Sequence, residues 1–153
     1  MKEIYERYIK KPVEEDLKST MVFIGGPRQT GKTTFALNFL PEPSEKHPAY
    51  LNWDDPGVRP SLLKGELPAN QKYIILDEIH KFARWRNLVK GFYDTNRSEI
   101  SFIITGSARL DYYSKGGDSL HGRYHYYRLH PFSPRELNSA PTKDDIQMLL
   151  KFG

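Results

Sequence analysis

Residues 26–33 read Gly-Pro-Arg-Gln-Thr-Gly-Lys-Thr, which fits the pattern G-x-x-x-x-G-K-T. The two glycines of this pattern, Gly26 and Gly31, let the backbone adopt positive φ and come close to a ligand. Successive N–H groups of such a turn point inward and form a concavity for anions. Lys32 adds a positive charge to this concavity, and the Thr33 hydroxyl is of the type that ligates Mg²⁺. The segment therefore predicts a phosphate-binding loop.

The residues on either side of the loop agree with this interpretation, because a phosphate-binding loop follows a β-strand and begins a helix. Residues 20–24 form a short apolar run of β-prone residues. Residues 33–40 have apolar positions at helical spacing and are followed by Pro41, which ends a helix. The alternative is a glycine-rich hairpin with an incidental lysine, and the flanking patterns disfavour it. We expect the loop and the start of its helix to bind a nucleotide, through Gly26, Pro27, Arg28, Gln29, Thr30, Gly31, Lys32, Thr33 and Thr34.

The composition limits the class of protein further. A length of 153 residues is typical of one domain with one core. The chain has no cysteine, which excludes disulfides and thiolate metal sites. A net charge of +4 favours anionic partners, including a nucleotide, but is too small to indicate nucleic acid by itself. The N-terminus lacks the apolar core of a signal peptide and no apolar run reaches membrane-spanning length, so we expect a cytoplasmic protein without a membrane partner.

Strand-like and helix-like patterns alternate along the chain. Short β-prone runs predict strands at 20–24, 49–53, 72–76, 100–104 and 124–130. Helical spacing predicts helices at 1–18, with a break at Pro12, at 33–40 and at 82–96, and two further helices that begin at Ser133 and Thr142. Strands that alternate with helices predict an α/β fold, in which a parallel sheet carries helices on both faces.

Two acidic residues, Asp77 and Glu78, directly follow the apolar strand at 72–76. The carboxyl ends of parallel strands open on the crevice in which α/β sheets bind ligands, so we expect both carboxylates beside the phosphate loop. We assign Asp77 to Mg²⁺, through a water molecule, and Thr33 as its partner ligand. We assign Glu78 as the general base for an attacking water. Taken alone, the pair would be interpreted as solvated acids at a strand end.

The strand at 100–104 is also followed by polar side chains. We expect one of them to face the γ-phosphate, with Ser107 as the first candidate and Thr105 as the second. Ser107 is equally suited to cap the helix that follows, and the two roles are compatible.

Together these segments resemble the AAA+ ATPases, and more narrowly the prokaryotic AAA-type ATPases whose phosphate loop reads G-P-R-Q-x-G-K-T-T. The resemblance rests on residues 26–34, 50–56, 75–81, 104–107, 122–124 and 129–133. It implies a P-loop NTPase fold, a three-layer αβα sandwich with a five-stranded parallel sheet in the order 5-1-4-3-2. It implies ATP as the nucleotide and Mg²⁺ as cofactor, with the Walker A pair Lys32 and Thr33, the Walker B pair Asp77 and Glu78, and Ser107 as sensor 1.

The resemblance also bears on partners and domains. Arg123 matches the arginine finger that completes a neighbouring subunit's active site, and Arg109 is a weaker candidate for this role. We therefore expect self-association through Arg123 or through an attached C-terminal domain. We expect an N-terminal helical arm at 1–18, the ATPase core at 19–140, and the truncated start of a C-terminal helical region at 141–153. Family members continue into further helices and a second domain, and the sequence has no match for a sensor-2 arginine.

Three functions stay open at this point. The first is ATP hydrolysis that drives a conformational change in an attached domain or partner, which Glu78 and Arg123 favour. The second is a nucleotide-gated binding module that hardly hydrolyses ATP, which the missing lid favours. The third is a P-loop kinase, which the Asp77–Glu78 pair disfavours because it suits an activated water better than an acceptor hydroxyl.

Two groups of charged residues have simpler interpretations. In the family's strand order, Asp54 and Asp55 would follow an edge strand about 14 Å from the phosphate loop, so we interpret them as turn formers rather than Mg²⁺ ligands. A row of basic residues on the helix after Glu78 predicts a solvated helix face and leaves a nucleic-acid partner open; it consists of Lys81, Arg84, Arg86 and Lys90.

Overall fold

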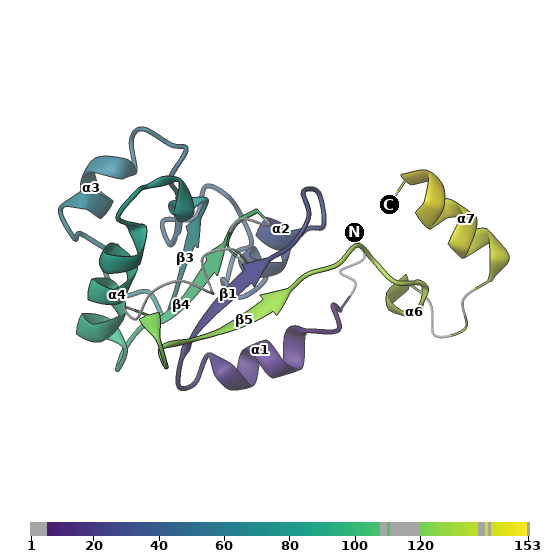
Figure 1. Cartoon of the computed structure of the whole chain (residues 1–153), viewed down its shortest axis with the longest axis horizontal. Helices are drawn as coiled ribbons and strands as arrows, with labels where there is room; N and C mark the ends of the chain where they lie inside the picture. Colours follow the sequence, from purple (N-terminus) through teal and green to yellow (C-terminus); the bar gives the residue numbers. More distant parts are fainter. Residues whose placement is uncertain (1–5, 108–109, 111–119, 138–139, 141, 153) are drawn as a thin grey trace.

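The computed structural model describes residues 6–107, 110, 120–137, 140 and 142–152. The strands are β1 (Met21–Gly25), β2 (Tyr50–Asn52), β3 (Tyr73–Asp77), β4 (Ser101–Thr105) and β5 (Tyr124–Arg128). The helices are α1 (Lys10–Asp16), α2 (Lys32–Leu37), α3 (Arg59–Leu63), the 3₁₀ turn η1 (Ile79–Lys81), α4 (Trp85–Asn96), α6 (Pro134–Leu137) and α7 (Lys143–Phe152). Figure 1 shows the strands side by side, with α1 to α4 around them and with α6 and α7 off to one side.

The five strands form one parallel sheet in the order β2-β3-β4-β1-β5. This is the order 5-1-4-3-2 seen from the other edge, so the predicted fold class and strand order are confirmed. The register places Asp77 of β3 opposite Thr105 of β4, and Thr105 opposite Ile24 of β1. The carboxyl ends of the three central strands, β3, β4 and β1, therefore lie together. We call this end of the sheet the carboxyl edge; the phosphate loop leaves β1 here.

Alternate side chains of the central strands enter two separate cores, which makes the protein three layers deep. Phe23, Leu76 and Ile104 face one layer with α3 and α4, and Val22, Ile75 and Ile103 face the other with α1 and α2 (Figure 1). Because both faces are covered, all five residues of β1 are buried, as in other parallel sheets with helices on both sides. Helices on both faces of the sheet therefore fix the position of the strand ends from which the loop begins.

The first helix differs from the prediction at Pro12. The helix α1 contains Pro12 in its first turn, where the expectation was a break at this residue. A proline is tolerated there because N–H groups of the first turn have no partner within the helix. Ile9, Val13 and Leu17 are buried in the core that also contains Val22 and Ile24, so this segment packs against the sheet.

The last two helices begin where the sequence indicates. The Ser133 N–H donates to the Glu136 carboxylate at 2.7 Å, and the Asp145 N–H donates to the Thr142 hydroxyl at 3.3 Å, which are contacts of the capping-box type. In Figure 1, α7 extends away from the sheet. Its exposed side chains include Ile146, Met148 and Leu150. Among the described residues, no helix has both the length and the apolar composition needed to cross a bilayer.

Candidate functional site

The loop between β1 and α2 has the backbone of an anion-binding turn. Its φ angles are positive at Gly26 (134°), Gln29 (61°) and Gly31 (82°). At Gly26 a Cβ atom would lie 2.3 Å from the Leu129 carbonyl oxygen, so a side chain there would collide with the chain after β5. Gln29 is not a glycine, and a left-handed backbone at such a residue stores strain of about 1–3 kcal/mol. The sequence pattern gives no sign of this strained position.

The amine of Lys32 turns back onto its own loop. Its Nζ donates to the Gly26 carbonyl at 3.1 Å and to the Pro27 carbonyl. Burial lowers the pKa of the Lys32 ammonium, and the nearby carboxylates of Glu78 and Asp77 counteract part of this effect. Phosphate oxygens placed in the loop would offer this amine stronger, charged acceptors than the two carbonyls.

Asp77, at the end of β3, holds three neighbouring segments together. Its Oδ2 accepts hydrogen bonds from the hydroxyls of Thr33 at 3.0 Å and Tyr50 at 2.7 Å, and its Oδ1 accepts one from Thr105 at 2.6 Å. Burial and the bond to Asp77 raise the pKa of the Tyr50 hydroxyl, which keeps it a donor. Thr105 was the second candidate for facing the γ-phosphate, and its hydroxyl instead donates to Asp77.

The Thr33–Asp77 contact fits a magnesium site. The Thr33 hydroxyl is placed to ligate the ion directly, and its hydrogen bond of 3.0 Å to Asp77 keeps the carboxylate close enough to hold the ion through a water molecule. Within the described part of the chain there is no cluster of three or more His, Cys, Asp or Glu side chains that could hold a metal ion. A metal at Thr33 and Asp77 would therefore need ligands from phosphate and water, which is the usual environment of Mg²⁺.

Glu78 follows Asp77 with a left-handed backbone, at φ 57°. Its N–H donates to the Thr105 carbonyl at 3.1 Å, which fixes the turn against β4. Its Oε2 lies 3.1 Å from the Lys81 Nζ and 3.7 Å from the His80 Nε2. Lys81 also pairs with Asp54, at 2.5 Å, so one amine bridges two carboxylates.

Ser107 lies on the far side of this turn. Its Oγ is 3.4 Å from the Nε2 of His80, a buried residue that the sequence analysis did not single out. The imidazole packs directly under Gly106, where a Cβ atom would lie 2.6 Å from its Nδ1. Ser107 and Glu78 therefore both contact the same histidine.

One open cavity of about 630 Å³ brings most of the predicted residues together. It is lined by Arg28, Gln29, Gly31, Lys32, Thr33, Thr34, Asp54, Asp77, Glu78, His80, Lys81 and Ser107. Asp55 forms the predicted turn, since its Oδ1 accepts from the Gly57 N–H at 2.8 Å. Asp54 also lies in the turn that follows β2, as predicted, and its carboxylate additionally contributes to the lining of the cavity.

Arg123 lies outside this cavity. It precedes β5, at the amino edge of the sheet, opposite the edge that holds the loop. Its Nε and Nη2 atoms contact the two carboxylate oxygens of Asp94 at 2.8 and 3.3 Å. Any contact with a neighbouring subunit's nucleotide would require this pair to open. Arg109, the weaker candidate, lies outside the described residues.

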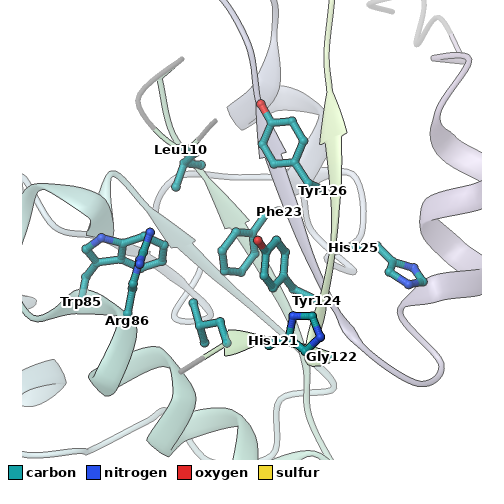
Figure 2. Close-up of a pocket in the computed structure, with 10 residues that line it drawn as sticks. Phe23, Trp85, Arg86, Leu110, His121, Gly122, Tyr124, His125 and Tyr126 are labelled. Carbon is teal, nitrogen blue, oxygen red and sulfur yellow. The ribbon is translucent and has the colours of Figure 1, made fainter. Parts of the chain in front are cut away.

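A second cavity, of about 390 Å³, lies between α4 and the β1–β5 edge of the sheet (Figure 2). Phe23, Trp85, Tyr124 and Tyr126 are among the residues that line it, and Arg86 lies beside Trp85. None of the phosphate-loop residues and neither of the acids after β3 contributes to it. The candidate site is therefore the cavity at the carboxyl edge.

A parallel five-stranded sheet with this strand order, a nest-forming loop after β1 and an acid pair after β3 define a P-loop nucleotide-binding protein. A family model described as an AAA domain matches residues 18–138. The chain thus belongs to the AAA-type P-loop ATPases and is a nucleotide-binding module of that family, which confirms the resemblance seen in the sequence. No curated protein matches the chain.

The close approach at Gly26 leads to a test of the loop. Gly26→Ala should lower the free energy of unfolding by at least about 1–3 kcal/mol, because alanine would be strained at φ 134° and would collide with the Leu129 carbonyl. Urea unfolding of the two proteins measures the difference.

Gly91 provides the matched control for this substitution. It lies in α4, where a Cβ atom would meet nothing within 4 Å. Gly91→Ala should stabilise the protein by about 0.5–1 kcal/mol, since a helical alanine loses less conformational freedom on folding than glycine does. If the two variants were equally stable, the described packing of the loop against residue 129 would be incorrect.

Proposed function

We propose that this AAA-type module binds ATP with Mg²⁺ at the carboxyl-edge cavity and hydrolyses it, and that hydrolysis drives a conformational change in an attached domain or partner. The observation that carries the proposal is the hydrogen bond at 3.0 Å between Thr33, at the start of α2, and Asp77, at the end of β3. It joins the loop suited to phosphate with the carboxylate suited to the metal. Both belong to the cavity that also contains Lys32 and Glu78.

The chain's own groups suggest a division of roles. The inward N–H groups of the loop and the ammonium of Lys32 would hold the β- and γ-phosphates. The Thr33 hydroxyl would ligate Mg²⁺ directly and the Asp77 carboxylate would hold it through a water molecule. When bound, the ion offsets charge on the phosphate oxygens. Tyr50 and Thr105 would keep the Asp77 carboxylate oriented, because each donates a hydrogen bond to it.

Glu78 is our candidate for the general base. In the proposed step its carboxylate takes a proton from a water molecule whose oxygen forms a bond to the γ-phosphorus. The bond between that phosphorus and the β–γ bridging oxygen breaks, which yields ADP and phosphate. Ser107, which contacts the same histidine as Glu78, would orient the γ-phosphate or the water by a hydrogen bond.

One observation favours the second candidate function, a binding module that holds nucleotide without turnover. Glu78 lies 3.1 Å from the Lys81 ammonium, so an ion pair occupies the carboxylate that an attacking water would have to contact. Hydrolysis would require this ion pair to open or to shift toward Asp54, which already contacts the same amine. Turnover measurements separate the two candidates directly.

The proposed domain organisation is an ATPase core over 19–140, preceded by the segment 1–18 and followed by the start of a C-terminal helical region at 141–153. Two features of α7 support a separate C-terminal unit: it extends away from the sheet (Figure 1), and it exposes Ile146, Met148 and Leu150. A nucleic-acid partner on the row of basic residues that runs from η1 into α4 is a weaker proposal. In that row Lys81 already contacts two carboxylates, and the Nζ of Lys90 lies 3.7 Å from Asp94.

Glu78→Gln tests the catalytic proposal. Glutamine keeps the shape of the side chain but cannot accept the proton, so ATP turnover should fall by about 10²–10⁴-fold while affinity for Mg·ATP stays within about twofold. Steady-state phosphate release and calorimetric titration measure the two quantities. Glu42→Gln, on the exposed linker after α2, is the control and should behave like wild type. Equal turnover in Glu78→Gln and wild type would remove Glu78 from the role of base.

Arg123→Ala tests the proposed contact between subunits. If Arg123 acts on a neighbouring subunit's nucleotide, the specific activity of the wild type should rise with protein concentration. The variant should then lose about 10³-fold or more in turnover, with little change in its affinity for nucleotide. Asp94→Asn removes only the negative charge that pairs with Arg123 and should keep the activity. A loss in Asp94→Asn as large as in Arg123→Ala would instead assign the pair a purely structural role.

A further inference from the structure

Arg7 is a buried cation close to the phosphate loop. It lies just before α1, and only 6% of the residue is exposed. Burying a guanidinium is costly unless its donors are satisfied, and a cation held in this way has a fixed position. The groups that Arg7 contacts therefore show which parts of the chain it ties together.

The guanidinium of Arg7 contacts three segments that are far apart in the sequence. Its Nη1 donates to the Thr30 carbonyl in the phosphate loop at 2.9 Å. Its Nε donates to the Glu136 carboxylate on α6 at 2.8 Å, and its Nη2 donates to the His130 carbonyl after β5 at 2.5 Å. Its Cζ lies 4.1 Å from the centre of the Phe132 ring, which adds a cation–π contact.

The bond to the Thr30 carbonyl affects the part of the loop that binds phosphate. The peptide group that contains this carbonyl also contains the N–H of Gly31, and in a trans peptide the two bonds point in opposite directions. By holding the carbonyl on the side of α1, Arg7 directs the Gly31 N–H away from itself and toward the nest. The flanking residues Gln29 and Gly31 both have positive φ, so this peptide lies in the strained part of the loop.

At its other end, Arg7 contacts Glu136, an acidic residue in the first turn of α6. The Glu136 carboxylate accepts hydrogen bonds from Arg7, from the Ser133 N–H at 2.7 Å and from the Tyr8 N–H at 3.2 Å. Burial raises the pKa of Glu136, but these hydrogen bonds outweigh it and hold the pKa below the ordinary value. Glu136 is therefore an ionised partner for Arg7 and a cap for α6 at the same time.

We propose that Arg7 is a positioning residue that couples occupancy of the phosphate loop to the docking of α6. The proposal rests on the proposed nucleotide binding at this loop. When Glu136 is docked, Arg7 is held against Thr30 and the loop keeps the peptide orientation that suits phosphate. Because such coupling is reciprocal, bound nucleotide stabilises the docked position of α6 to the same extent.

The test combines nucleotide affinity with hydrogen exchange. Mg·ADP is titrated into wild type, Arg7→Lys, Glu136→Gln and the double variant by calorimetry. Lysine keeps the charge but cannot reach three acceptors at once, and glutamine keeps an acceptor oxygen but lacks the charge. We expect each single variant to bind Mg·ADP at least about fivefold more weakly, and the double variant to be no weaker than the weaker single variant.

The second measurement is the rate of amide hydrogen exchange at residues 133–137. If Arg7 had only a structural role, nucleotide would not change this rate. In wild type, Mg·ADP should slow exchange at these amides, and in both single variants the slowing should be lost even at saturating Mg·ADP. Arg135→Gln is the matched control, since Arg135 lies on the same helix with an exposed side chain. It should keep both the affinity and the nucleotide-dependent slowing.

The outcomes separate this inference from the proposed function. Wild-type protein that binds Mg·ADP without any change in exchange at 133–137 overturns the coupling and leaves nucleotide binding intact. Slowing that persists in Arg7→Lys and Glu136→Gln also overturns it. If Arg7→Lys fails to fold, Glu136→Gln decides, because its amide oxygen can still accept from Ser133 and Tyr8. Wild-type protein that does not bind Mg·ADP at all contradicts the proposed function itself.

Discussion

The carboxylate of Asp77 is the group on which the architecture of the site depends. It accepts hydroxyl hydrogen bonds from Thr33 after the loop, from Tyr50 on β2 and from Thr105 on β4. A buried carboxylate is costly unless it is satisfied, and here the donors come from three different segments. The same hydrogen bonds that stabilise its charge therefore align the loop, the metal-binding carboxylate and the sheet edge. An ion at Thr33 and Asp77 would enter a site whose geometry is already fixed by packing.

Residues with strained backbones and charged side chains cluster near this carboxylate, which is typical of functional sites. Two residues that are not glycine, Gln29 and Glu78, have left-handed backbones at the cavity, one in the loop and one directly after Asp77. Such conformations persist only where surrounding contacts determine them. For Glu78 the contact is the bond from its N–H to the Thr105 carbonyl, and near Gln29 it is the buried Arg7 on the neighbouring Thr30 carbonyl. The cavity thus depends on contacts well beyond its own lining.

Much of this arrangement could be predicted from the sequence, because the loop and the acid pair are local patterns. The resemblance supplied the strand order, which the fold and the family match confirm. Contacts between distant side chains could not be predicted: Tyr50 on Asp77, His80 beneath Gly106, and Arg7, whose partner His130 is 123 positions away. The contribution of the Asp54 side chain to the cavity lining could not be predicted either, because strand spacing gives only distances between backbones. Pro12 was misjudged because it lies in the first helical turn, where a proline costs little.

The central claim is that the loop and Asp77 form one magnesium-dependent nucleotide site. Calorimetric titration of a nonhydrolysable ATP analogue, with and without Mg²⁺, into wild type and Lys32→Ala tests it most directly. The account predicts binding to wild type that weakens strongly when Mg²⁺ is removed, and loss of binding in a folded Lys32→Ala protein. Equal affinity in the two proteins, or affinity that does not depend on Mg²⁺, would contradict it.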